Sequence, residues 1–261
     1  MRVSVLGATG AMGGSVIKCA LQDGHSIVNK VSSKDNISML FRRADVVIDF
    51  SCPVATEAML RHIYDRKVNT PIVVGTTGLS KLHINLMRQC AEFTSIFSTP
   101  NMSVLVALTN VIVYELAQLL DEDFEVEISE THHRLKKDAP SGTAIMLGKT
   151  VAEARKQNFS DVANFARFGI VDPRKRGEIG FSVKRCGRVN GIHSVDFIND
   201  NECISIRHEA FSREIFARGA VSAAKWVFQQ KPGFYNMTDL TKEAVTPVLN
   251  NIINSLFTSS T

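Results

Sequence analysis

The stretch Val3-Ser4-Val5-Leu6-Gly7-Ala8-Thr9-Gly10-Ala11-Met12-Gly13 decides the fold class of this chain of 261 residues. Its first four residues form a short, mainly apolar run that is typical of a buried strand, and the run ends at Gly7. From Met12 to Leu21, apolar residues recur at helical spacing. The order strand, glycine turn, helix predicts an anion site formed by backbone N–H groups and the positive end of a helix.

The glycines of this turn have separate structural roles. Gly7 permits a tight turn, Gly10 leaves space for phosphates beside the backbone, and Gly13 lets the helix pack closely on the strand. A turn without any ligand is the plainer interpretation. The position directly after the first strand favours the pyrophosphate of a dinucleotide instead.

The residues after the second expected strand leave the choice of dinucleotide open. An acidic residue about 20 positions after the glycines commonly contacts the ribose of NAD. Here the sequence reads Ser32-Ser33-Lys34-Asp35. The hydroxyls and Lys34 suit the 2′-phosphate of NADPH, whereas Asp35 suits NADH, and Lys34 is equally compatible with a solvated loop charge. We therefore expect NADPH or NADH as the cofactor.

Strands and helices alternate through the first hundred residues. We expect further strands at 25–31, 44–50 and 70–74, and helices at 56–65 and 80–93. This alternation predicts an α/β fold with a Rossmann-type, doubly wound parallel sheet. Gly75-Thr76-Thr77-Gly78 follows the fourth strand, where its backbone and hydroxyls suit a nicotinamide amide, although such a turn also occurs without a ligand.

The pattern changes at Thr99-Pro100-Asn101-Met102, which we interpret as a hinge between two domains. A helical segment at 104–120 is followed by period-2 patterning at 124–129, 178–185, 192–198 and 202–207. Because no helices separate the last three strands, we predict a second α+β domain with an open mixed sheet that buries one face. From Arg213 the helical pattern returns.

The stretch Glu130-Thr131-His132-His133-Arg134-Leu135-Lys136-Lys137-Asp138-Ala139-Pro140-Ser141-Gly142-Thr143 is the most informative about chemistry. Its first half gathers histidines and cations, and its second half predicts a helix start capped by Ser141. A charge-assisted hydrogen bond is worth about 1.5–3 kcal/mol, so these two anion-binding halves suffice to hold a small dianion. A histidine here is suited to donate a proton as a hydride arrives.

Each residue of this stretch, taken alone, is also compatible with a structural role. One histidine can be a satisfied structural residue, the lysines a solvated face, and Ser141 only a helix cap. Adjacent histidines do not readily share one metal, and no familiar set of Asp, Glu or Cys ligands completes a site, so we expect no metal. The whole stretch together favours an anion-binding site.

Composition excludes several classes of protein. With 44% hydrophobic and 21% charged residues, the chain is neither disordered nor fibrous. The 30 Lys and Arg exceed the 26 Asp and Glu by four and are spread along the chain, which argues against a nucleic-acid partner. Five dispersed cysteines without metal spacing suggest reduced thiols. With no export signal and no long apolar run, we expect a cytoplasmic protein without a membrane segment.

At these motifs the chain resembles the dihydrodipicolinate reductase family, also called 4-hydroxy-tetrahydrodipicolinate reductases, of bacterial diaminopimelate and lysine biosynthesis. The H-H-x-x-K run followed by D-A-P-S-G-T-A is highly specific to it, and the match runs nearly end to end. The other matching motifs are the glycine turn, Asp49-Phe50-Ser51, Gly75 to Gly78, Pro100-Asn101-Met102-Ser103 and Phe216-Ala217-Arg218-Gly219-Ala220.

The resemblance implies hydride transfer from NAD(P)H to a cyclic dicarboxylate, the product of the preceding synthase, with loss of water, giving tetrahydrodipicolinate. It implies that His132 is the proton donor and Lys136 the second catalytic residue, while His133, Gly142 and Thr143 bind substrate carboxylate. The implied cofactor contacts are Gly7, Ala8, Thr9, Gly10, Ala11, Met12, Gly75, Thr76, Thr77, Thr99, Pro100, Asn101 and Met102.

The resemblance also implies an assembly and a division of labour. We expect a nucleotide-binding domain at 1–103, completed by 213–261, and a domain at 104–212 that binds substrate and joins the subunits of a homotetramer. The alternatives are a nicotinamide-binding regulator and a reductase of another small dicarboxylate. The chain departs from the family in its short segment after the second strand, in Met102 where Phe is common, and in its longer tail after Thr241.

Overall fold

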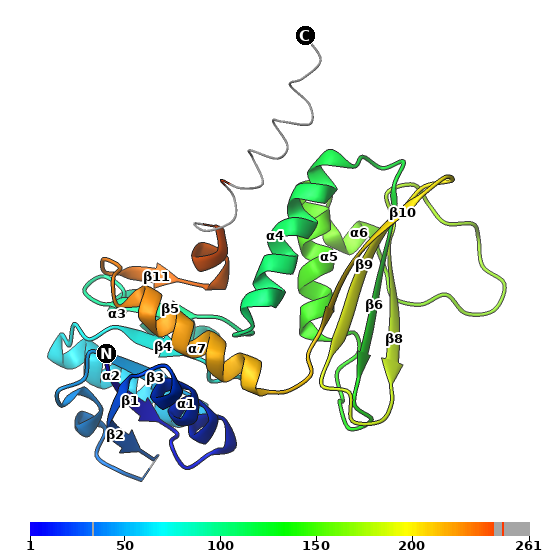
Figure 1. Ribbon diagram of the computed structural model, residues 1–261. Coiled ribbons are helices and arrows are strands. Elements are labelled where there is room, and N and C mark those ends of the chain that lie inside the picture. Colours follow the sequence, from blue (N-terminus) through cyan, green and yellow to red (C-terminus); the bar gives the residue numbers. More distant parts are fainter. Residues whose placement is uncertain (33, 243–246, 248–261) are drawn as a thin grey trace. The chain divides into compact units, whose positions relative to one another are not determined.

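A computed structural model of the protein describes residues 1–32, 34–242 and 247 (Figure 1). The chain divides into two compact units. The first combines Met1–Val104 with Glu214–Thr261, and the second is Leu105–Arg213. The tail that departs from the family pattern lies largely outside the described residues.

The first unit is built on a six-stranded sheet in which every pairing is parallel. Its strands, in spatial order, are β11 (Gly233–Tyr235), β5 (Ser95–Ser98), β4 (Ile72–Val74), β3 (Val46–Asp49), β1 (Arg2–Leu6) and β2 (Ser26–Val31). Both β3 and β4 are buried along their whole length, because helices cover both faces of a parallel sheet.

Helices lie on both faces of this sheet (Figure 1). The helices α1 (Ala11–Gln22) and α7 (Glu214–Val227) pack against each other on one face, and α2 (Pro53–Arg66) and α3 (Lys81–Cys90) pack together on the other. A short 3₁₀ helix, η1 (Ile37–Phe41), joins β2 to β3. This arrangement confirms the predicted Rossmann-type, doubly wound sheet.

The strand order places the ligand-binding edge of the first unit. The chain runs from β1 outward to β2 on one side and then continues through β3 on the other side. Ligands of open α/β sheets bind beyond the carboxyl ends of the strands, where the order reverses in this way. That point in this chain lies beyond β1 and β3.

The second unit has a five-stranded sheet with the order β10-β9-β6-β8-β7. Its strands are β6 (Glu125–His132), β7 (Ala163–Asn164), β8 (Ile179–Arg185), β9 (Ile192–Ile198) and β10 (Cys203–Glu209). Because β6 pairs parallel with β8 and antiparallel with β9, the sheet is mixed, as predicted.

Three helices accompany this sheet: α4 (Val104–Leu119), α5 (Gly142–Ala154) and the short α6 (Phe159–Val162). In the described part of the unit, α4 and α5 lie on one face of the sheet and the opposite face carries no helix (Figure 1). Burial along β6 therefore alternates, with Val126, Ile128, Glu130 and His132 on the buried face. The first two belong to the apolar core and the last two begin a polar site.

Candidate active site

The glycine turn of the first unit has the geometry that a dinucleotide requires. Gly7 has a φ of +80°, and its N–H donates to the carbonyl of Val31 at 2.8 Å. A Cβ on Gly13 would lie 2.1 Å from the carbonyl oxygen of Gly7, so only glycine permits this approach of helix to turn. Gly10 is the exposed N-cap of α1 and adds no side chain over the first N–H groups of the helix.

The other predicted cofactor loops follow the carboxyl ends of β4 and β5, so they lie at the same edge of the sheet as the glycine turn. In the first loop, the Thr76 hydroxyl accepts a hydrogen bond from the Ser51 N–H at 3.0 Å and is buried, while Thr77 is exposed. In the second, the Thr99 hydroxyl donates to the carbonyl of Asn101, and Met102 is buried. Thr76 therefore has a structural use as well.

Asp49 organises this edge of the sheet, although its sequence motif indicated no role for it. The carboxylate is fully buried and accepts hydrogen bonds from the Ser51 hydroxyl and the Thr56 hydroxyl, each at 2.5 Å, and from the Ser51 N–H at 3.0 Å. Burial raises the pKa of Asp49, and these hydrogen bonds oppose the rise. The result is a fixed loop between β3 and α2, beside Thr76.

In the segment expected to contact the ribose, residues 32–35, the side chain of Asp35 makes its hydrogen bonds within the segment. The Asp35 carboxylate accepts hydrogen bonds from the N–H and the hydroxyl of Ser32, both at 2.7 Å, and the bond to the hydroxyl is the main reason that the pKa of Asp35 is lowered. Its oxygens are thus partly used within the loop. Ser33 lies outside the described residues.

In the second unit, His132 ends β6 with its ring held by Glu130, two residues earlier. The Nδ1 atom of His132 lies 2.5 Å from Oε2 of Glu130, and both side chains are buried. Burial lowers the pKa of His132, Glu130 opposes this, and Lys136 and Arg185 lower it further. Because Glu130 is an acceptor when ionised, Nδ1 is the donor, and Nε2 is the nitrogen left for a ligand.

Glu130 stays ionised because three groups hydrogen-bond to it. Arg185 of β8 donates to both carboxylate oxygens, at 2.8 and 2.7 Å, and the Ser141 N–H donates to Oε1 at 3.0 Å. Burial raises the pKa of Glu130, but the bonds from Arg185, His132 and Ser141 outweigh it, so the pKa is lowered overall. Sequence reasoning assigned no role to Glu130 or Arg185.

Two further histidines lie beside this pair on the same face of the sheet. His193 of β9 is opposite Glu130, and its ring meets the His132 ring edge-on with the centroids 5.1 Å apart. His208 of β10 is opposite His193. Burial is the main reason that the pKa of His193 falls to about 4, and it also lowers the pKa of His208. Both histidines are therefore neutral at physiological pH.

The predicted helix start is present as expected. Ser141 is the N-cap of α5, and its hydroxyl accepts a hydrogen bond from the Ala144 N–H at 3.2 Å. The first helical residues are Gly142, which is exposed, and Thr143. The Ser141 hydroxyl also lies 2.9 Å from Nε2 of His193. The helix start and the His132 cluster are thus joined by hydrogen bonds through Ser141.

The loop between β6 and α5 holds the remaining predicted residues. Nζ of Lys136 lies 2.9 Å from Oδ1 of Asp138, and this bond lowers the pKa of Asp138. His133 lines a cavity of about 510 Å³ together with Leu135, Gly187, Asn190 and three arginines, Arg134, Arg188 and Arg213. Within the described chain, the buried Nδ1 of His133 has no hydrogen-bond partner. Arg134 therefore borders a cationic cavity.

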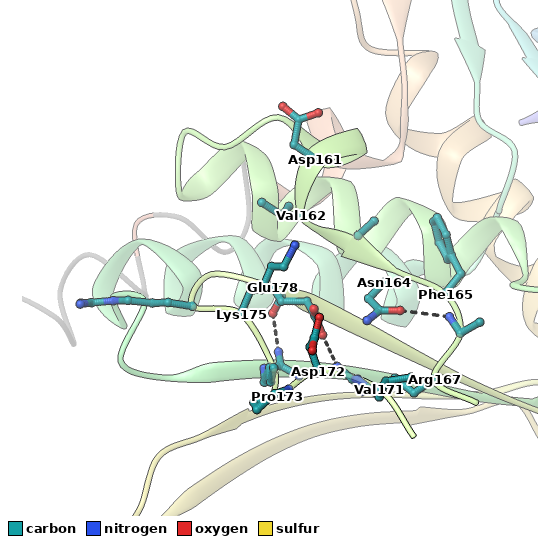
Figure 2. A pocket seen from close by; sticks show the side chains of 14 residues that line it. Asp161, Val162, Asn164, Phe165, Arg167, Val171, Asp172, Pro173, Lys175 and Glu178 are labelled. Atoms are coloured by element: carbon teal, nitrogen blue, oxygen red, sulfur yellow. Dashed lines mark hydrogen bonds and ion pairs between the residues drawn. The ribbon is translucent and has the colours of Figure 1, made fainter. Parts of the chain in front are cut away.

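A second cavity in this unit, of about 430 Å³, is lined by residues 161–167, 171–176 and 178 (Figure 2). Its arginines are held in ion pairs: Arg167 lies 2.5 Å from Glu178, and Arg174 contacts Glu127, which lies outside the lining. None of the sequence-predicted site residues lines it. We therefore place the candidate active site at the His132 cluster, which consists of Glu130, His132, Ser141, Arg185 and His193.

Over residues 1–32, 34–242 and 247, no three His, Cys, Asp or Glu side chains lie together as a metal site would need. Within the same residues, no helix combines the length and the apolar character needed to cross a membrane.

A doubly wound sheet with a glycine turn, and a further unit that holds a carboxylate-bound histidine beside a capped helix start, define a dinucleotide-dependent oxidoreductase of a small anion. The family model for the N-terminus of dihydrodipicolinate reductase matches residues 1–102, and the model for its C-terminus matches residues 106–241. This chain belongs to the dihydrodipicolinate reductase family, whose members use NADH or NADPH.

Curated relatives agree with this assignment. The 4-hydroxy-tetrahydrodipicolinate reductase of Geotalea uraniireducens is 37% identical over 265 residues, and the alignment covers 92% of this chain and 98% of the relative. The reductase of the same name from Campylobacter jejuni is 38% identical over 240 residues, with the same coverage. These relatives are reductases, and they give no support to a regulator without turnover.

Solved structures show the same fold at lower identity. Dipicolinate-bound dihydrodipicolinate reductase from Paenisporosarcina sp. TG-14 superposes with a TM-score of 0.73 at 19% identity, covering 92% of this chain and 98% of the other. A probable dehydrogenase from Thermotoga maritima gives a TM-score of 0.57 at 9% identity, covering 96% and 97%.

Proposed function

We propose that this chain catalyses the NAD(P)H-dependent reduction of 4-hydroxy-tetrahydrodipicolinate to tetrahydrodipicolinate, in diaminopimelate and lysine biosynthesis. The observation that carries this proposal is the match to reductases of that name along nearly the full length of both chains. The hydrogen-bonded cluster of Glu130, His132 and Ser141 supplies the chemistry that such a reaction requires.

The first unit is proposed to hold the dinucleotide, which supplies the hydride when bound. The glycine turn fits this group, because a Cβ at Gly13 would collide with the turn and Gly10 adds no side chain at the helix start. The proposed contacts are Gly7, Ala8, Thr9, Gly10, Ala11, Met12, Gly75, Thr76, Thr77, Thr99, Pro100, Asn101 and Met102. All of them follow carboxyl ends of strands in one sheet.

The second unit is proposed to bind the dicarboxylate and to move the proton. His133 and the start of α5, at Gly142 and Thr143, would hold substrate carboxylate, because the positive end of a helix favours an anion. His132 would donate its proton from Nε2, and Lys136 would be the second catalytic residue. The positively charged residues that border the His133 cavity also favour a negatively charged ligand.

We also propose that the second unit joins the subunits of a homotetramer and that the enzyme works in the cytoplasm. The sheet face without a helix in the described unit supports a subunit contact there, since one face of the sheet is otherwise uncovered. The molar mass of the protein in solution, measured by light scattering after size-exclusion chromatography, would test the assembly. A monomer would overturn the proposed homotetramer.

The test of the activity is a coupled assay in which the synthase makes the substrate and the oxidation of NADPH or NADH is followed by absorbance. We expect turnover that depends on both the synthase product and the reduced cofactor. Absence of turnover by the folded wild-type protein with either cofactor would overturn the proposed function. Running both cofactors side by side also measures their preference.

A further inference from the structure

The carboxylate of Glu130 is shared between two parts of the candidate active site. One oxygen, Oε2, lies 2.5 Å from Nδ1 of His132, and the other, Oε1, accepts from the Ser141 N–H at 3.0 Å. Arg185 donates to both oxygens, at 2.8 and 2.7 Å, and so fixes the plane of the carboxylate. The Glu130 side chain is only 1% exposed, which leaves it little freedom to exchange these partners for water.

The contact to His132 determines which ring nitrogen faces the ligand. An ionised carboxylate only accepts, so Nδ1 keeps its proton and Nε2 is the nitrogen that gains or loses one. The ring is also packed, because His193 meets it edge-on and a Cβ on Gly191 would lie 3.0 Å from Nε2. The orientation of His132 is thus fixed by its partner and its neighbours.

The contact to Ser141 determines where α5 begins. The Ser141 N–H is held by Glu130, and the Ser141 hydroxyl caps the Ala144 N–H and contacts His193. Gly142 and Thr143, the proposed carboxylate site, come directly after this anchored residue. Moving Glu130 would therefore move both the proton donor and the proposed carboxylate site.

We infer that Glu130 is a positioning residue that fixes the proton donor His132 relative to the substrate-binding start of α5. One carboxylate oxygen holds His132, and the other holds Ser141 at the start of the helix. This inference rests on the proposed function for the roles of those two groups. The chemistry of the substrate explains why it is useful: a dicarboxylate held at its carboxylates presents its reacting atoms at a fixed distance. A proton donor tied to the same anchor reaches them in a defined geometry.

The charged and titratable groups that face His132 set how its proton responds to a change at Glu130. Glu130 of β6 favours the charged imidazole, Arg185 of β8 and Lys136 of the following loop disfavour it, and burial disfavours it most. His193 of β9 faces the ring and is neutral, with His208 of β10 beyond it. Neutralising Glu130 removes the favourable charge and leaves the two unfavourable ones.

The decisive substitution is Glu130→Gln, because an amide cannot accept at both ends. The backbone N–H of Ser141 can only donate, so the amide oxygen is expected to stay with it. The amide NH₂ then faces Nδ1 of His132, which becomes an acceptor only if its proton moves to Nε2. We therefore expect His132 to change its tautomer and its titration while the start of α5 is preserved.

Three measurements separate these effects. We expect the His132 imidazole, followed by NMR on ¹³C-histidine protein, to titrate at lower pH in Glu130→Gln than in wild type. The falling limb of kcat against pH moves in the same direction, and kcat itself falls by about 10²-fold, as for loss of a general acid. Affinity for dipicolinate, used as a dead-end dicarboxylate, stays within about threefold, since Ser141 keeps its partner.

The matched variants test the two halves of the inference. Glu130→Ala removes both contacts, so dipicolinate affinity falls by about tenfold in addition to the loss of kcat. Glu127→Gln, on the same strand but on its other face and paired with Arg174 and Arg167, is the control for loss of a carboxylate–arginine pair. It is expected to leave the His132 titration and the pH profile unchanged.

The outcomes that overturn the inference are specific. A Glu130→Gln protein with reduced kcat but an unchanged His132 titration and pH profile would show that Glu130 only stabilises the fold. If Glu130→Gln does not fold, Arg185→Gln decides the matter: removing that cation is expected to move the His132 titration to higher pH, and no movement would overturn the inference. Imidazole titration and dipicolinate binding need no turnover, so failure of the proposed reaction is recognised separately, in the wild type.

Discussion

His193 shows how a titratable side chain is accommodated beside a buried ion pair. It lies opposite Glu130 in the sheet, only 5% exposed, with Ser141 as its hydrogen-bond partner. A second positive charge next to His132 and Arg185 would be costly in this buried setting. Burial first, and then the nearby His132, hold the pKa of His193 at about 4, so it stays neutral.

This neutrality predicts a loss of stability in mild acid. The pKa of His193 is about 4 in the folded chain and about 6.5 when unfolded, so the unfolded chain binds the proton more readily. Neutral His193 therefore contributes to the free energy of unfolding above pH 6.5, and this contribution is lost as pH falls toward 4. The loss is at most about 3 kcal/mol. Urea unfolding across this window is expected to show a shallower pH dependence for His193→Gln than for wild type. Equal slopes would contradict the prediction.

The catalytic assignments predict a split between turnover and cofactor binding. His132→Gln and Lys136→Ala are expected to lower kcat by about 10²-fold or more, because each removes a group that would act on the substrate. Dissociation constants for NADPH and NADH, measured by fluorescence, are expected to stay unchanged, since the proposed cofactor contacts belong to the first unit. Lys137→Ala, at an exposed neighbour in the same loop, is the control with normal kcat. Equal losses of kcat and cofactor affinity would indicate a structural cluster.

At the scale of single residues, sequence motifs predicted residues of the candidate site but not the hydrogen bonds that join them. The H-H-x-x-K run and the Ser141 cap were predictable because their residue types have local functions at short spacing. Arg185 and His193 were not, because they lie 55 and 63 positions after Glu130 in the sequence. Only the pairing of the strands brings them beside Glu130 and His132. A charged or histidine residue within a period-2 strand has no local signature of that kind.

Among the elements, the first turn of α1 gives opposite predictions for two adjacent glycines. In Gly13→Ala the new Cβ would lie 2.1 Å from the Gly7 carbonyl oxygen, which is backbone and cannot swing away. We expect a loss of about 1–3 kcal/mol in stability and a loss of cofactor binding. In Gly14→Ala nothing lies within 4 Å of the new Cβ, so the helix gains about 0.5–1 kcal/mol.

Urea unfolding and cofactor fluorescence, measured on both variants, check this pair. Gly14→Ala is the matched control, because it makes the same chemical change one residue further along the helix. Normal stability and normal cofactor affinity in Gly13→Ala would show that the turn relaxes, and would remove the support that this close approach gives to the dinucleotide site.

Long elements followed from the sequence more readily than short ones. The period-2 patterns at 178–185, 192–198 and 202–207 correspond to β8, β9 and β10 to within two residues at each end. By contrast, β5, β11 and η1 have only three to five residues each, too few to show a hydrophobic period. Their existence depends on a neighbour, as β11 does on β5.

At the scale of the whole molecule, the first unit is made from two distant parts of the chain. The returning helix α7 packs on α1 and carries a row of small buried residues, Ala217, Gly219, Ala220, Ala223 and Ala224. Small residues permit close backbone approach, and at Gly219 this approach is to the loop at Met102. The return of the chain thus supports a loop that we propose to contact the cofactor.

Gly219→Ala tests the close packing of α7 against the loop at Met102. Its Cβ would lie 1.6 Å from the carbonyl oxygen of Met102, so the helix or the loop must move. We expect a loss of about 2 kcal/mol or more in the free energy of unfolding, together with weaker cofactor binding. Ser222→Ala, at an exposed position of the same helix, is the control and is expected to change stability by less than about 0.5 kcal/mol. If Gly219→Ala were destabilised while cofactor affinity stayed normal, the loop at Met102 would have no part in cofactor binding.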